Sequence, residues 1–166
     1  ETSGKGTLEF STPADVSAAN GAPGTWLIDP EDIIIGDTEA ESISTALNGG
    51  SNVEIKTSDD GEGEGNIEVN SAIIKTEGGD ASLSLTAHNR IDINAPITSE
   101  SGALNVSLDA GTGIGVFAAI TTNGGSIVQL VRGVTETEVD IVSDVENATD
   151  SDTVQPEVEE GSEAST

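Results

Sequence analysis

Short runs of alternating apolar and polar residues recur along the middle of the chain, and three of them are copies of one eight-residue phrase. The copies are residues 66–73, 90–97 and 113–120, which begin 24 and then 23 positions apart. In each copy, apolar β-branched residues hold the second and fourth places, and isoleucine holds the eighth. Alternation with a period of two indicates a half-buried β-strand, because successive side chains of a strand point to opposite faces. We therefore expect each phrase to form strands with one buried face.

A second, shorter phrase lies between these copies and follows a glycine turn. It reads apolar–polar–apolar at residues 53–55, 83–85, 106–108 and 128–130, and glycine precedes each copy by a few positions. Self-similarity at a fixed period of about 22 to 24 residues is typical of a solenoid. The pattern predicts an all-β parallel β-helix of about five or six rungs, in which equivalent residues stack at the ordinary spacing between strands.

The predicted core of this β-helix is a set of stacked columns. They are Ile67, Ile91 and Ile114; Val69, Ile93 and Val116; and Ile73, Ile97 and Ile120. Around the repeats the chain divides into three parts. Residues 1–25 are predicted to be an N-terminal strand, cap or linker, residues 26–134 the β-helix, and residues 135–166 an acidic C-terminal strand and tail.

The segment before the repeats predicts further short strands. Leu8 and Phe10 alternate with polar residues, which favours a strand there, and Trp26 is large enough to anchor the first rung. Asp29–Pro30 indicates a turn, and residues 43–47 are interpreted as the start of another strand. Because no amphipathic segment is evident as a capping helix, we expect unpaired strand edges at both ends of the stack.

One segment resembles a known family. Residues 24–33 read Gly-Thr-Trp-Leu-Ile-Asp-Pro-Glu-Asp-Ile, and the strand phrases at residues 52–57, 66–73 and 83–97 continue the likeness. The sequence resembles the filamentous-haemagglutinin-like exoproteins of two-partner secretion over roughly residues 20–127. This resemblance implies a long right-handed parallel β-helix, exported to the surface of Gram-negative bacteria, that acts as an adhesin or a stalk. The Asn-Pro-Asn-Gly secretion motif of that family is absent from this sequence, and the acidic tail lies outside the family pattern.

Composition narrows the classes of partner. The chain has 31 acidic and 5 basic residues, for a formal net charge of −26, so it offers no basic face to nucleic acid or to an anionic membrane surface. No apolar run is long enough to insert into a membrane. Cysteine is absent, which excludes disulfides and thiolate metal sites.

Four carboxylates lie close together in one glycine-rich loop, at Asp59, Asp60, Glu62 and Glu64. Calcium prefers six to eight oxygen ligands, and this loop would supply several of them. The loop lacks the spacing of an EF-hand and of the glycine-rich calcium-binding nonapeptide, so a solvated acidic loop is the other interpretation. No other cofactor is predicted.

The remaining candidates have simpler interpretations. His88 is the single histidine and lies in a predicted turn, without a second histidine or a cysteine to share a metal or a catalytic role. Arg90 and Asp92 flank Ile91, so they point to the same outer face and would form a surface ion pair. The glycine-rich segment 109–115 does not precede a predicted helix, so it is interpreted as a tight corner rather than a dinucleotide-binding loop.

The leading hypothesis is a non-enzymatic structural β-helix unit of a secreted bacterial surface adhesin or extracellular fibre. Its partners would be the rest of a longer β-helix or further copies of itself, joined end to end by strand addition, and host or surface glycans. The alternative is a carbohydrate-binding or polysaccharide-degrading β-helix with acids and Arg90 on one face. The chain has three aromatic residues, few for stacking on sugar rings. Ice or mineral binding is a third hypothesis, which Thr121–Thr122 supports only weakly.

Overall fold

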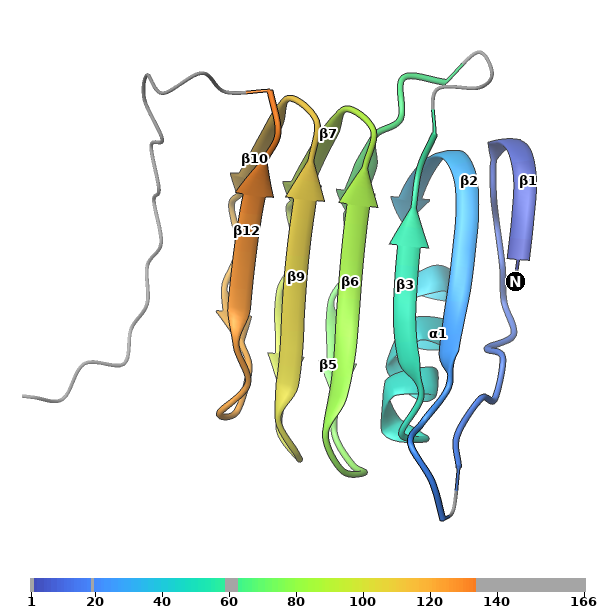
Figure 1. The fold of residues 1–166 in the computed structure, drawn as a ribbon, viewed down its shortest axis with the longest axis vertical. Helices are drawn as coiled ribbons and strands as arrows, with labels where there is room; N and C mark the ends of the chain where they lie inside the picture. Colours follow the sequence, from blue (N-terminus) through green and yellow to red (C-terminus); the bar gives the residue numbers. More distant parts are fainter. Residues whose placement is uncertain (1, 19, 59–62, 134–166) are drawn as a thin grey trace, which may run out of the picture.

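The computed structural model describes residues 2–18, 20–58 and 63–133, and neighbouring strands in this part of the chain pair in parallel. Strands dominate this part of the chain, and one helix accompanies them (Figure 1). In chain order the elements are β1 (Thr2–Thr7), β2 (Thr25–Ile35), α1 (Asp37–Asn48), β3 (Asn52–Lys56), β4 (Ile67–Val69), β5 (Ile73–Lys75), β6 (Ala81–Ala87), β7 (Arg90–Ile93), β8 (Ile97–Ser99), β9 (Leu104–Ala110), β10 (Gly113–Val116), β11 (Ile120–Thr121) and β12 (Ile127–Val131).

The strands form two sheets. The larger has the order β10-β7-β4-β2-β3-β6-β9-β12, with β1 paired to β2 at the side, and the smaller has the order β11-β8-β5. The long strand β2 joins the two halves of the larger sheet, because Thr25–Ile28 pair with β3 whereas Ile33–Ile35 pair with β4. The prediction of a turn at Asp29–Pro30 is therefore wrong. Strand β2 continues through these two residues, which pair there with β1. A register shift follows in β1, an irregularity of the kind that accommodates proline in a strand.

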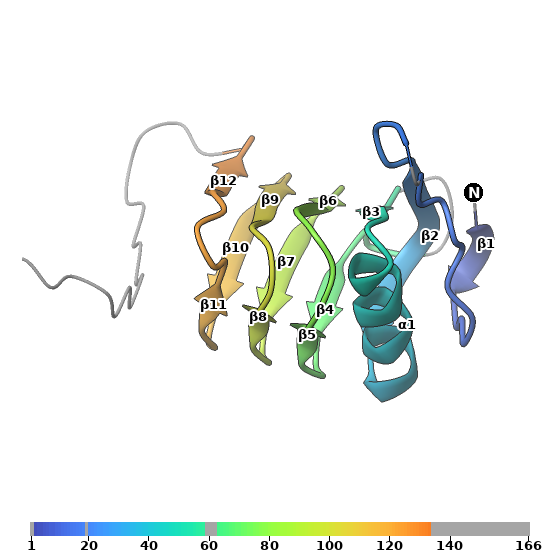
Figure 2. The same cartoon turned by 90° about the horizontal axis from the view of Figure 1, so that it is seen from below.

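Three successive strands repeat as a unit, which we call a layer: β4–β5–β6, then β7–β8–β9, then β10–β11–β12. Figure 2 shows these layers side by side along the molecule. The three predicted columns are confirmed, since each residue of a column is the register partner of the next. Ile91, for example, pairs with Ile67 on one side and with Ile114 on the other.

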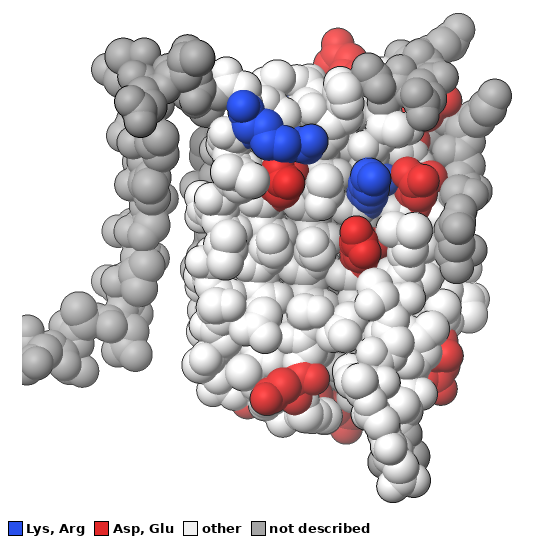
Figure 3. Space-filling model, viewed as in Figure 1, with Lys and Arg blue, Asp and Glu red and all other residues white. Residues whose placement is uncertain are grey.

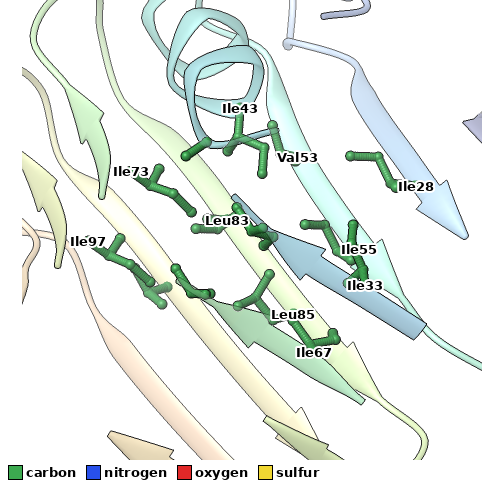
Figure 4. Close-up of a cluster of buried hydrophobic side chains, with 14 of the residues drawn as sticks. Ile28, Ile33, Ile43, Val53, Ile55, Ile67, Ile73, Leu83, Leu85 and Ile97 are labelled. Carbon is green, nitrogen blue, oxygen red and sulfur yellow. The ribbon is translucent and has the colours of Figure 1, made fainter. Parts of the chain in front are cut away.

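The apolar residues of the layers meet in one continuous core. Figure 4 shows side chains from both sheets and from α1 pointing into it. Ile67, Ile91 and Ile93 are fully buried, as are Leu83 and Leu85. Burial alternates strictly along β6 and β9, so each strand has one face in the core and one face outside. The period-two pattern therefore places the strands correctly.

The helix α1 corrects the expectation that residues 43–47 begin a strand and that no capping helix is present. Ala40, Ile43 and Leu47 lie on its buried side, and the backbone N–H of Gly36 donates to the Glu39 carboxylate at its first turn. Gly50 ends it with a φ of 80°. The spacing of three and four positions between Ala40, Ile43 and Leu47 is helical. Among the described residues, no helix has the length and apolar character of a transmembrane span.

The N-terminal strand lies earlier than predicted. β1 covers Thr2–Thr7, whereas Leu8 and Phe10 follow it. Phe10 is buried and packs edge-on against Trp26, with ring centroids 5.2 Å apart. Trp26 is 1% exposed, and its indole N–H donates to the Thr2 hydroxyl at 3.2 Å. Trp26 therefore anchors this end of the core, as the sequence indicated.

The last strand, β12, is one residue out of the predicted register. Ile127 pairs with Val106, so that Gln129, and not Leu130, pairs with Leu108. Because side chains alternate, a slip of one residue exchanges the two faces of a strand. Val128 and Leu130 consequently point outward and are 55% and 53% exposed.

Candidate functional site

The predicted calcium loop lies mostly outside the described residues, which include neither Asp59, Asp60 nor Glu62. Glu64 is exposed, and its backbone N–H donates to Asp32 Oδ2 at 3.1 Å. Asp32 Oδ1 accepts a second bond, at 2.7 Å, from the backbone N–H of Asn66. Asp32 therefore ties down the point where the acidic loop returns to the layers. In the described part of the chain, no group of three or more potential metal ligands lies together, and calcium binding stays a prediction.

Arg90 and Asp92 form the predicted ion pair on the outer face of β7. The Arg90 Nε lies 2.8 and 2.9 Å from the two carboxylate oxygens, and this hydrogen bonding raises the pKa of the guanidinium. The two side chains are 45% and 25% exposed. Solvent therefore screens the pair, which we expect to contribute under about 1 kcal/mol to stability.

His88 and the glycine-rich segment occupy neighbouring corners. His88 is exposed in the bend between β6 and β7, and its backbone N–H donates to the Thr57 hydroxyl at 3.1 Å. One layer further on, Gly111 forms the corner between β9 and β10. A Cβ atom on Gly111 would lie only 1.8 Å from the carbonyl oxygen of His88. The segment is thus a tight corner, as predicted. Glycine is needed at position 111 because the backbone of the preceding corner, at His88, lies too close for a side chain.

Lys75 is a buried charged group that the sequence analysis missed. It is fully buried at the end of β5, and its Nζ donates to the carbonyl oxygens of Glu77, Gly78 and Ser101 at 2.6, 3.2 and 2.5 Å. Burial lowers the pKa of this amine, while the nearby carboxylates of Asp80 and Glu77 act in the opposite direction. Because Ser101 belongs to the turn of the next layer, Lys75 joins two successive turns. The only sequence signal was its place at the inward end of an alternating strand.

A shallow surface groove is lined by Glu9, Phe10 and Ser11 and by the first residues of α1, Asp37–Glu39. The face of the larger sheet drawn in Figure 3 is mostly uncharged, and Ser84 of β6 and Ser107 of β9 face outward there. Of the three aromatic side chains, only Phe117 is exposed.

The two ends of the stack of layers differ sharply, and this is the distinctive feature of the molecule. At one end, α1 takes the place that a strand of the smaller sheet holds in later layers (Figure 2). Ser44 Oγ accepts a bond from the backbone N–H of Ile74 at 2.9 Å, and Asn48 Oδ1 accepts one from Thr76 at 2.9 Å. The edge of β5 is therefore satisfied by helix side chains, while β1 pairs with β2 alongside.

At the other end, both sheets finish in the same layer. Within the described residues, β10 and β12 are the two outer strands of the larger sheet, and β11 is the outer strand of the smaller one. We call these three strands the open layer. Their inward side chains are less covered than those of earlier layers: Ile114, Val116 and Ile120 are half-buried, and Ile127 is 40% exposed.

Comparison with known proteins adds no neighbour to this description. No protein-family model, no curated protein sequence and no solved structure matches the chain.

Proposed function

We propose that the chain is a right-handed parallel β-helix and serves as a non-enzymatic structural unit of a secreted bacterial surface adhesin or extracellular fibre. The observation that carries the proposal is the register of the layers. Equivalent apolar residues pair across three successive layers in both sheets, in parallel strands. Each repeat adds the same buried columns, and such an architecture extends by adding layers without any change in design.

The two ends of the stack bear on how the unit would join others. Head-to-tail stacking of copies needs a free strand edge at each end. At one end α1 covers the smaller sheet, whereas β1, which among the described strands pairs with β2 alone, is an edge strand of the larger sheet. The open layer presents strand edges at the other end. The arrangement is compatible both with a segment of a longer β-helix and with copies joined end to end through the larger sheet.

Side-chain ladders along the outside of the layers also support a structural role. Asn89 Nδ2 donates to Asn66 Oδ1 at 2.9 Å, and Thr112 Oγ1 donates to Asn89 Oδ1 at 2.7 Å. Asn94 and Asn70 form a second ladder, with 2.8 Å between amide nitrogen and oxygen. These groups bind each other along the stack and are thereby engaged in holding layers together.

Immunogold electron microscopy of the source cells, with antibody raised against this chain, tests the proposal. We expect label along filaments or stalks at the cell surface, which protease treatment of intact cells removes. Label confined to the cell interior would contradict it. A glycan array, read with and without a calcium chelator, tests the alternative: specific sugar binding by the purified chain would favour a carbohydrate-binding β-helix.

A further inference from the structure

The turn between β11 and β12 carries an asparagine followed by a glycine at its tip. Residues 122–125 form this turn, and the backbone N–H of Gly125 donates to the Thr122 carbonyl at 3.1 Å. The two residues between them have positive φ angles, 50° at Asn123 and 91° at Gly124. Positive φ at both central positions is the pattern of a type I′ turn, which this dipeptide favours. Local sequence and backbone conformation therefore agree here.

An asparagine that precedes glycine can convert its own side chain to a carboxylate. The backbone nitrogen of the glycine attacks the side-chain amide carbon, a C–N bond forms, and the amide nitrogen leaves as ammonia. Water then opens the resulting cyclic imide to give aspartate or isoaspartate. Glycine favours the attack because it has no side chain to obstruct the ring. The reaction also needs a backbone N–H that is free to lose its proton.

The tip of this turn meets these conditions. Among the described residues, the backbone N–H of Gly124 has no hydrogen-bond partner, and a Cβ there would meet nothing within 4 Å. Asn123 is exposed, and its amide nitrogen donates to the Gly102 carbonyl at 3.3 Å, a long hydrogen bond. The attacking nitrogen is thus open to solvent, and the leaving group is weakly held.

The same dipeptide at the end of α1 has the opposite environment. The side-chain oxygen of Asn48 accepts bonds from the backbone N–H groups of Thr76 and Glu77. The backbone N–H of Gly49, which would have to attack, donates to the Thr45 carbonyl at 3.0 Å. Reaction at Asn48 therefore requires local opening of the helix end. The fold separates two sites that the dipeptide alone does not distinguish.

We propose that Asn123 is a site of spontaneous deamidation, at which the open layer gains a carboxylate without the action of an enzyme. Residues 110–131, which include the whole open layer, contain no aspartate, glutamate, lysine or arginine. The product is the first charge in that layer, and it no longer donates to the Gly102 carbonyl. Isoaspartate also adds a carbon atom to the backbone of the turn. The reaction is a property of this turn and does not depend on the proposed function.

The isoaspartate form weakens the contact between this turn and the layer before it. The backbone N–H of Leu104, the first residue of β9, donates to the Thr122 carbonyl at 2.9 Å. The hydroxyl of Thr122 donates in turn to the Gly125 carbonyl at 2.8 Å. An additional backbone atom between Thr122 and Gly125 displaces one side of the turn from the other. The Leu104 amide consequently loses part of its protection.

Peptide mapping by mass spectrometry, on the full folded chain in mildly alkaline buffer, measures the conversion of amide to acid at each site. We expect Asn123 to convert at least about tenfold faster than Asn48, since only Asn48 requires local opening. Asn20, which is exposed and precedes Gly21 between β1 and β2, is the reference for an accessible site. In urea, Asn123 and Asn48 should convert at similar rates. An Asn123 that converts no faster than Asn48 in the folded chain, or an equal advantage in urea, would overturn the proposal.

Amide hydrogen exchange tests the effect on the layer. In an Asn20→Gln background, the purified isoaspartate form should exchange the Leu104 amide faster than the unmodified chain does. The amide of Ala81, which donates to the Ala103 carbonyl of the preceding turn at 2.9 Å, should be unchanged. Asn123→Gly removes the side-chain bond, adds no charge or backbone atom and suits a positive φ, so it should leave Leu104 protected. Unchanged exchange at Leu104 in the isoaspartate form would overturn the effect on the layer and leave the reaction in place.

Discussion

The side-chain oxygen of Asn48 accepts a hydrogen bond from the backbone N–H of Thr76 at 2.9 Å, across 28 positions of the sequence. The same oxygen lies 3.2 Å from the backbone nitrogen of Glu77. Asn48 is the last residue of α1, and the two amides follow β5 directly. One side chain thus satisfies two backbone donors at the edge of a sheet, where an unpaired donor would invite association with another strand.

Replacing Asn48 removes this acceptor from the edge. We expect Asn48→Ala to lower the free energy of unfolding by about 0.5–1.5 kcal/mol, because two exposed backbone donors exchange this acceptor for water. Asn48→Asp keeps the acceptor oxygen and should lose less. Thr45→Ala is the matched control, since its hydroxyl bonds only to the Glu41 carbonyl of the same helix. Urea denaturation measures all three, and equal losses for Asn48→Ala and Thr45→Ala would show that the cap contributes nothing.

Lys75 predicts a dependence of stability on pH. Burial lowers the pKa of its amine from the ordinary 10.5. Between the folded pKa and 10.5, the unfolded chain holds a proton that the folded chain has released. Unfolding then takes up a proton, so the contribution of Lys75 to the free energy of unfolding rises with pH across this window.

The matched comparison is with Lys75→Met, which cannot titrate. The free energy of unfolding of the native chain, minus that of the variant, should increase as the pH rises toward 10.5. Lys56→Met, at an exposed lysine, controls for the loss of one positive charge. A native–variant difference that stays constant with pH, in urea unfolding at matched salt, would contradict the prediction.

The repeating strands could be predicted from the sequence because their signal is redundant. Each phrase alternates with a period of two, and each recurs at nearly the same interval, so the alternation and the repeat indicate the same buried face. Ile67, Ile91 and Ile114 hold the same place in their phrases and lie on the apolar face of the alternation. They pair as predicted. The ion pair of Arg90 with Asp92 followed from the same alternation.

The last strand could not be placed from the sequence because its composition is ambiguous. Residues 127–131 have apolar side chains at four of five positions, so either register buries apolar groups. A polar contact supports one of them: both the backbone N–H and the hydroxyl of Ser126 donate to Asn105 Oδ1, at 3.0 and 3.1 Å. Contacts of this kind depend on the layer below. They leave no trace in local periodicity.

The capped end and the buried lysine were missed for a related reason. Ser44 and Asn48 function only because α1 lies against β5, and Lys75 is buried because two successive turns offer it carbonyl groups. Lysine usually lies at the surface, and the carbonyl groups of the two turns reverse that preference for Lys75. The candidate site at the end of the stack therefore needed the structure, whereas the repeats did not.

The glycine turns predict a contrast between two neighbouring glycines. Gly102 has a φ of 69°, and a Cβ there would lie 2.4 Å from the carbonyl oxygen of Gly79. Gly102→Ala should therefore lower the free energy of unfolding by more than about 1 kcal/mol. Gly79→Ala, where the added methyl group would meet nothing within 4 Å, should be close to neutral. Thermal melting followed by circular dichroism compares them, and similar melting temperatures would mean that the turn is not held in this conformation.

Ile93 tests the stacking of the layers directly. It is fully buried and pairs in register with Val69 on one side and Val116 on the other. Ile93→Asp places a charge between two apolar neighbours, so we expect it to lower the free energy of unfolding by more than about 4 kcal/mol or to prevent folding. Ile93→Val should cost only about 0.5–1.5 kcal/mol. Asp92→Ser, at the adjacent outward position, should cost less than Ile93→Asp, since it removes only a solvent-screened ion pair with Arg90. Urea unfolding that ranks Asp92→Ser as the more damaging of these two would place the wrong face of β7 in the core, and the columns on which the layers depend would have to be redrawn.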